Sequence, residues 1–195
     1  IEDALMREGV PYRVIGGVRF YERKEIKDAL AYLRLVINPH DDVSFRRVVN
    51  VPARGIGKSV LEALDAMDVA AEDDHADMPL LSAGLQPAPV PRSLWARTLL
   101  ALERQKLPSR ALVALTGFRD LLVSLADEAA GGGVATTLSR TLDRSGYLQA
   151  LRDERSEEAE GRVENLMELV SAAREYETRE ADPSLGGFVD RLSLL

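Results

Sequence analysis

Hydrophobic residues spaced three and four positions apart recur through most of the chain and predict helices. The first such run starts at Glu22 and ends at Asn38-Pro39. A short helix capped by Asp41 or Asp42 should follow and continue through Asn50, before Pro52 breaks it because proline has no N–H to donate. The core-facing positions expected in the first helix are Ile26, Ala29, Leu30, Leu33, Val36 and Ile37.

The same period returns in later segments, each preceded by a turn or a capping residue. The predicted helix starts are Lys58, Ser93, Ser109 (with Pro108 in the turn before it) and about Glu157. A glycine run at 131–133 ends the pair of helices that start at Ser93 and Ser109. Asp182-Pro183-Ser184 interrupts the pattern before a last segment. The inward positions expected near the start and the end of this stretch are Val60, Leu61, Leu64 and Met67, then Val163, Leu166, Met167, Val170 and Ala173.

Two segments break the helical pattern. "VPYRVIGG", residues 10–17, is β-branched and aromatic and predicts one strand. A lone strand leaves its backbone groups unpaired, so residues 1–22 are expected to be the edge of a neighbouring domain. Residues 71–92 are acidic and then proline-rich, which is typical of an exposed linker. The predicted fold class is therefore mainly α, with a multi-helix unit at 23–180 and a C-terminal segment at 181–195.

Composition narrows the chemistry. The chain has 195 residues, no cysteine and two histidines, which excludes disulfides and thiolate metal sites and leaves little imidazole for catalysis. No apolar run is long enough to span a membrane and the first 30 residues do not resemble a signal peptide, so a cytoplasmic protein is expected. The chain starts at Ile1 within an apparent helix, so we interpret it as a piece of a larger protein.

Charge is unevenly distributed. The net charge of −7 argues against a protein that coats nucleic acid with its whole surface. Between Asp42 and Glu62, however, there is no acidic residue, and the basic residues of this stretch are Arg46, Arg47, Arg54 and Lys58. A local basic patch is therefore predicted within an acidic chain.

This stretch includes Gly57-Lys58-Ser59, the tail of a phosphate-binding loop. A Walker A loop needs a glycine five positions before Gly57, and that position holds Pro52. No acidic strand for Mg²⁺ is evident either. We therefore do not expect a nucleotide site here.

The same residues fit a helix–hairpin–helix turn better. The glycines in Gly55-Ile56-Gly57 permit close backbone approach, and Ile56 can anchor the turn in the core. The next helix then offers unpaired N–H groups at residues 57–59, with Ser59 near the cap. Such a turn binds DNA phosphate without reading bases. The candidate DNA-binding residues are Arg54, Gly55, Ile56, Gly57, Lys58 and Ser59, with Arg46 and Arg47 beside them.

Other interpretations remain open. Gly-Ile-Gly can be a plain turn that binds nothing, and the domain can instead be a protein-interaction platform whose acidic helices recruit repair or transcription partners. "EDDHAD", residues 72–77, could approach a divalent ion, but a solvated acidic loop explains it more simply, and no metal site is predicted. Trp95 and Phe118 stand alone at helical spacing and are expected in the core. An enzyme with its own active site lacks any supporting constellation of residues.

Two long runs closely resemble one protein family. "GVPYRVIGGVRFYERKEIKDALAYLRLVINPHDDVSFRRVVNVPARGIG" resembles superfamily 1 DNA helicases of the UvrD, PcrA and Rep type where motor domain 2A gives way to subdomain 2B. "SGYLQALRDERSEEAEGRVENLMELVSAAREYE" resembles the end of that insertion. The two matches bracket the chain, whereas residues 71–133 match only loosely.

The resemblance implies a role for this chain. In that family the whole enzyme is an ATP-driven 3′–5′ translocase, and its helical 2B subdomain contacts the duplex ahead of the fork through Gly-Ile-Gly turns. Residues 1–22 would then be the end of a 2A segment and 181–195 would lead back toward 2A. "GGVRFYERKEIKD" would lie near the single-strand path, which makes Arg19 and Arg23 further candidates for DNA contact.

The family's Walker A loop, Mg²⁺ motif, adenine motif and arginine finger have no counterpart in the chain. No cofactor is therefore expected in this chain, with ATP and Mg²⁺ belonging to the parent helicase. The resemblance predicts a non-catalytic module that grips duplex DNA or a single-strand/duplex junction without sequence preference, next to the rest of the motor.

Overall fold

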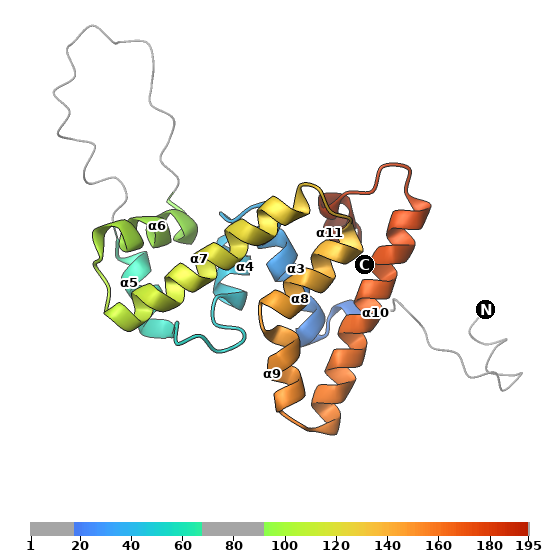
Figure 1. The fold of residues 1–195 in the computed structure, drawn as a ribbon, viewed down its shortest axis with the longest axis horizontal. Coiled ribbons are helices and arrows are strands. Elements are labelled where there is room, and N and C mark those ends of the chain that lie inside the picture. The colour runs from blue at the N-terminus through green and yellow to red at the C-terminus, as the bar shows by residue number, and fades with distance from the viewer. Residues whose placement is uncertain (1–17, 68–91, 195) are drawn as a thin grey trace, which may run out of the picture.

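Helices make up the regular structure of the described part of the chain, residues 18–67 and 92–194 of a computed structural model, and no strand occurs there (Figure 1). The strand predicted at 10–17 and the acidic run at 72–77 lie outside the described residues, as does all but the last residue of the linker predicted at 71–92. The helices are α2 (Val18–Tyr21), α3 (Lys24–Ile37), α4 (Asp42–Val48), α5 (Lys58–Asp65), α6 (Leu94–Arg104), α7 (Ser109–Ala129), α8 (Val134–Arg144), α9 (Tyr147–Asp153), α10 (Glu157–Arg179) and α11 (Leu185–Ser193).

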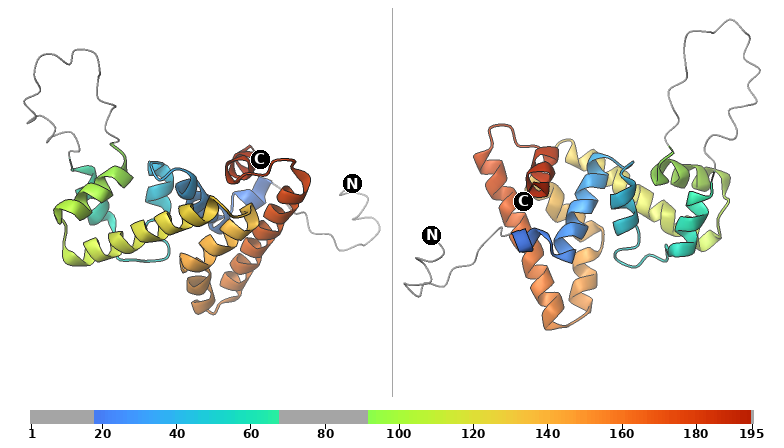
Figure 2. Two further views of the ribbon diagram at one scale, coloured as in Figure 1. Left: turned by 45° about the horizontal axis from the view of Figure 1, so that its top comes forward. Right: turned by 180° about the vertical axis from the view of Figure 1, so that it is seen from behind.

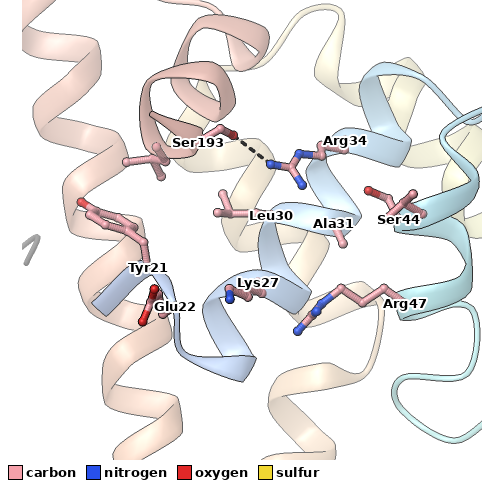
Figure 3. Close-up of a pocket in the computed structure, with 11 residues that line it drawn as sticks. Tyr21, Glu22, Lys27, Leu30, Ala31, Arg34, Ser44, Arg47 and Ser193 are labelled. Carbon is pink, nitrogen blue, oxygen red and sulfur yellow. Dashed lines mark hydrogen bonds between the residues drawn. The ribbon is translucent and has the colours of Figure 1, made fainter. Parts of the chain in front are cut away.

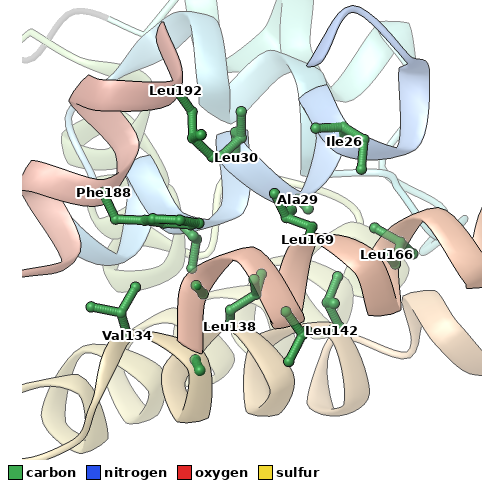
Figure 4. Close-up of a cluster of buried hydrophobic side chains, with 14 of the residues drawn as sticks. Ile26, Ala29, Leu30, Val134, Leu138, Leu142, Leu166, Leu169, Phe188 and Leu192 are labelled. Carbon is green, nitrogen blue, oxygen red and sulfur yellow. The ribbon is translucent and has the colours of Figure 1, made fainter. Parts of the chain in front are cut away.

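One hydrophobic core lies where α3, α8, α9, α10 and α11 meet (Figure 4). Ile26, Ala29, Leu30 and Leu33 supply one face of α3, and Leu138 and Leu166 contact them from α8 and α10. Phe188 on α11 is also fully buried in this cluster, so the C-terminal segment packs on the helical unit. Burial of such side chains contributes roughly 1.5–3 kcal/mol each and is the main force that assembles these helices.

A second core lies on the other face of α3. Ala31, Tyr32 and Leu35 face α4–α7 there, together with Phe45 and Phe118, whose rings meet edge to face at 5.5 Å. The two views of Figure 2 show α5, α6 and the start of α7 at one end of the molecule and α10 and α11 at the other. Helix α3 therefore forms a wall of both cores.

A buried polar network joins α3 to its neighbours. The Asp28 carboxylate, 2% exposed, accepts hydrogen bonds from Lys24 Nζ at 2.8 Å and the Tyr147 hydroxyl at 2.9 Å, and it forms an ion pair with Arg47 Nε at 2.8 Å. Burial and then the neighbouring Asp28 charge raise the pKa of Tyr147 far above its usual value, which keeps the phenol protonated as a donor. Glu25, also buried, accepts from Asn165 Nδ2 at 2.7 Å. The carboxylates thus fix α3 against α4, α9 and α10.

Most sequence-predicted elements are confirmed. The first long helix ends at Ile37 with Asn38 as its C-cap, Asp41 caps α4, and Ser93 caps α6. Trp95 and Phe118 lie in the core as expected. Two predictions of inward positions are wrong: Ile37 is 47% exposed and Met167 is 40% exposed. In α10 the fully buried positions are Leu166, Leu169 and Ala173, because α8 and α3 approach the helix from the side that carries them.

Candidate nucleic-acid interface

The segment between α4 and α5 forms a braced turn. Gly55 has a φ of +83°, a conformation that L side chains rarely adopt, so glycine is needed at this position. Ile56 is 1% exposed and packs into the second core. The Asn50 side-chain oxygen accepts from the backbone N–H groups of Arg54 at 2.7 Å and Ile56 at 3.1 Å. Ile56 therefore anchors the turn in the second core, and the Asn50 side chain holds the backbone of the turn by hydrogen bonds.

Helix α5 begins at this turn without a side-chain cap. Gly57 is its N-cap, and no side chain accepts from the first turn of the helix. Among the described residues, the backbone N–H groups of Gly57, Lys58 and Ser59 have no hydrogen-bond acceptor. These donors carry the positive end of the helix dipole, so the arrangement can accept an anionic oxygen.

Lys58 and Ser59 are both exposed at this helix start. The Lys58 side chain is 90% exposed and lies 3.5 Å from Glu62 one turn along α5. An exposed pair of this kind contributes little and leaves the ammonium free to turn toward a phosphate.

The Arg54 guanidinium does not point outward, as a contact with phosphate would require. It points inward and donates to the carbonyls of Val48 (3.2 Å), Val49 (3.3 Å), Pro52 (3.2 Å) and Ser145 (2.9 Å), and to the Tyr32 hydroxyl (2.7 Å). It also lies over the rings of Phe118, at 5.4 Å, and Tyr32, at 5.9 Å. Burial raises the pKa of Tyr32, and the Arg54 charge partly offsets that rise. The geometry therefore gives Arg54 a place inside the protein.

Arg110 is a cation beside the turn that the sequence did not suggest. This exposed residue in the first turn of α7 places its Nε 3.6 Å from the point where a Cβ on Gly55 would lie. It is 55 positions from Gly55 in sequence, so only the packing of α7 on the second core brings it there. Helix α7 also starts without a side-chain cap, since its N-cap residue is Pro108. No local motif could have indicated this contact.

Arg46 and Arg47 lie on α4 and are paired with acids. Arg46 Nη2 lies 2.6 Å from Asp65, a bond that raises the pKa of Arg46 and lowers the pKa of Asp65. Arg47 binds the buried Asp28. With Lys27 and Arg34, Arg47 also lines a pocket of about 310 Å³ between α3, α4 and α11, shown in Figure 3. Both arginines are thus partly neutralised and lie away from the first turn of α5.

The two weaker candidates, Arg19 and Arg23, lie just before the first residue of α3. Arg23 is the N-cap of α3, and its guanidinium donates to the Asn165 side chain and lies over the Phe20 ring. Arg19 lies in α2, but its side chain falls outside the described residues. The Arg23 side chain thus contacts α10 and Phe20 and does not lie at the turn.

Within residues 18–67 and 92–194, no cluster of three potential metal ligands occurs, and no helix has the length and apolar character of a membrane span.

Comparisons with known proteins find sequences similar to this chain. Residues 1–74 match the model of the UvrD-like helicase C-terminal domain. The chain is 37% identical over 185 residues to DNA helicase II of Escherichia coli K12, with 95% of the chain and 23% of the relative covered. It is 34% identical over 195 residues to the ATP-dependent DNA helicase PcrA of Bacillus subtilis, with 100% and 24% covered.

A third relative extends the match to another lineage. The chain is 38% identical over 193 residues to the ATP-dependent DNA helicase UvrD1 of Mycobacterium tuberculosis H37Rv, with 95% of the chain and 22% of the relative covered. The chain thus spans about a quarter of the length of the relatives it matches.

Proposed function

Because this chain belongs to the UvrD/PcrA type of DNA helicases, we propose that it is the helical subdomain with which such a helicase grips duplex DNA. The subdomain itself carries out no chemistry, and ATP-driven unwinding belongs to the whole protein. The duplex, or the junction of duplex and single strand, is held through its phosphates at the turn formed by residues 54–59.

The observation that carries this proposal is the uncapped start of α5 between two exposed cations. The N–H groups of Gly57, Lys58 and Ser59 offer donors to a phosphate oxygen. Lys58 and Arg110 flank these donors, and neither is buried. Backbone donors and flanking cations together are the usual components of a phosphate contact.

The arrangement suits a grip that does not depend on sequence. Residues 55–57 offer no side chain that could read a base edge, since Gly55 and Gly57 have none and Ile56 is buried. A motor that moves along one strand has to hold and release any duplex ahead of it. Phosphate contacts meet that need because every step of the duplex presents the same phosphates.

The expected strength follows from the number of phosphates held. With Lys58 and Arg110 each neutralising one phosphate, the dissociation constant should lie around 10⁻⁴ to 10⁻⁶ M and the log–log salt slope should be about −1.8. Weak binding of this kind allows the grip to engage and release.

The test is fluorescence anisotropy with a labelled single-strand/duplex junction, titrated at several salt concentrations. A Gly57→Val, Lys58→Glu double variant, shown by circular dichroism to be folded, should lose the binding. Arg174→Glu is the matched control, because it makes the same charge change as Lys58→Glu but on α10, a helix at the opposite end of the molecule from α5 (Figure 1).

Two results would contradict the proposal. Equal losses in the double variant and the control would mean that overall charge, and not the turn, attracts DNA. Absence of salt-dependent binding by the native chain at low salt would direct the search to protein partners.

A further inference from the structure

Arg54 makes more hydrogen bonds than any other side chain in the described residues, yet none goes to an acid. Its acceptors are carbonyl oxygens and one phenol, and its partners lie in three separate parts of the fold. A guanidinium has five N–H donors in a rigid planar fork. Here Nη1 faces the three carbonyls of Val48, Val49 and Pro52, and Nη2 donates to the Ser145 carbonyl and the Tyr32 hydroxyl. The charge is balanced by dipoles and by the faces of two aromatic rings.

The three parts held by Arg54 define where the turn sits. The carbonyls of Val48, Val49 and Pro52 belong to the end of α4 and the segment that leads into the turn. Tyr32 belongs to α3. Its hydroxyl accepts from Arg54 and donates to the carbonyl of Val51. Ser145 belongs to the α8–α9 junction, 91 positions away, and is buried. Arg54 therefore connects the turn to both hydrophobic cores.

We propose that Arg54 is a positioning residue: it orients the N–H groups of Gly57, Lys58 and Ser59 toward phosphate without touching DNA itself. The inference rests on the proposed function, since it concerns the same turn. It also assigns the two arginines next to Gly55 different tasks, Arg54 inside the fold and Arg110 on its surface.

Lysine cannot replace arginine in this role. An ammonium has three donors at one point and cannot reach carbonyls spread over α4, the turn and Ser145. An Arg54→Lys variant keeps the charge but leaves several buried carbonyls without a donor, so the turn should shift or loosen. A direct phosphate contact, in contrast, would tolerate lysine well because lysine binds phosphate as a point charge.

Salt dependence separates the two roles. Each cation that neutralises a phosphate releases counterions and contributes about 0.9 to the log–log slope, whereas neutral backbone N–H groups contribute none. Loss of Lys58 should therefore weaken binding and flatten the slope by about 0.9. Loss of correct N–H placement should weaken binding and leave the slope unchanged.

The experiment compares the native chain, Arg54→Lys and Lys58→Gln by anisotropy with the labelled junction, at salt concentrations that define the slope. Thermal unfolding by circular dichroism comes first, and binding is measured well below each transition. We expect Arg54→Lys to bind about tenfold more weakly, which corresponds to one or two lost backbone contacts, with the native slope. Lys58→Gln should bind more weakly with a flatter slope.

A measurement on the native chain covers the case in which Arg54→Lys does not fold. In NMR titration with the junction, the backbone amide signals of residues 57–59 should shift, while the Arg54 guanidinium signals should stay in place. Shifted guanidinium signals would overturn the inference, as would unchanged affinity in a folded Arg54→Lys.

Failure of the inference and failure of the proposed function differ in these data. If native binding is salt-dependent and Lys58→Gln weakens it while Arg54→Lys does not, the grip stands and the role of Arg54 is wrong. If the native chain shows no salt-dependent binding, the grip itself is wrong and the inference falls with it.

Discussion

The guanidinium of Arg110 lies against Gly55, with Nε 3.6 Å and Nη2 3.9 Å from the position of a Cβ that glycine lacks. The contact joins the first turn of α7 to the segment between α4 and α5. Residue 55 also has to adopt a positive φ, which glycine does without strain. Both the shape of the turn and its surface charge depend on this pair.

Gly55→Ala should lower the free energy of unfolding by about 1–2 kcal/mol, because an L residue in the left-handed region is strained. The added methyl would meet Arg110 at an ordinary van der Waals distance, so the cost comes from the positive φ. Urea denaturation measures the change. Gly117→Ala on α7 is the control, since nothing lies near its Cβ position and alanine in a helix should raise stability by about 0.5–1 kcal/mol. Equal effects of the two substitutions would contradict the prediction.

Arg110→Gln should weaken junction binding several-fold and flatten the log–log salt slope by about 0.9, because one cation leaves the phosphate contact. The Arg110 side chain makes no hydrogen bond or ion pair with any described residue, so thermal stability should hardly change. Anisotropy at several salt concentrations measures both quantities. Arg174→Gln on α10 is the matched control and should reproduce the native slope. A native slope in Arg110→Gln would remove this residue from the grip.

Asp28→Asn should cost about 2 kcal/mol of unfolding free energy, because it leaves Arg47 and Lys24 without their buried carboxylate. The cost is less than for a fully buried pair since both cations are partly exposed. Chemical denaturation is the measurement. Asp65→Asn breaks exposed pairs with Arg46 and Arg97 and should cost less than about 1 kcal/mol. Similar costs at the two positions would show that burial of Asp28 adds nothing.

Asp41→Ala should cost about 1 kcal/mol at neutral pH through loss of the α4 N-cap. Burial alone would raise the pKa of Asp41, but the Ser44 hydroxyl and the N–H groups of Ser44 and Val43 lower it overall. The folded pKa is thus below the unfolded value of about 3.9, so the stabilisation is present above about pH 4 and is lost as pH falls through the folded pKa. Denaturation at pH 7 and about pH 3 should show the difference between variant and native shrinking. A constant difference would contradict this assignment.

Local chemistry explains which parts of the fold and site could be predicted from sequence. Asp41 is a cap because its side chain meets N–H groups two and three residues on, and Ile56 is buried because it is the one large apolar residue in its turn. Such effects are visible over a few residues. The 3.6-residue period likewise indicated the long helices but not which face of α10 lies against its neighbours, which is why Met167 was misplaced.

The arginines show where sequence reasoning stops. Arg54 and Lys58 look alike in sequence, as basic residues that flank Gly-Ile-Gly. Their environments differ because Tyr32 and Ser145, distant along the chain, converge on Arg54 and supply its acceptors. Arg110 reaches the turn through the packing of α7, which no short motif records.

The position of α3 between the two cores has a consequence for cooperativity. Both hydrophobic cores lose part of their packing without this helix, since Leu30 and Leu33 belong to the first core and Tyr32 and Leu35 belong to the second. Local melting at either end of the molecule therefore exposes apolar surface that α3 shares with the remaining half. The two halves should unfold together in one calorimetric transition, with equal van't Hoff and calorimetric enthalpies. The turn proposed to hold DNA at one end and the C-terminal helix at the other are in this sense parts of one thermodynamic unit.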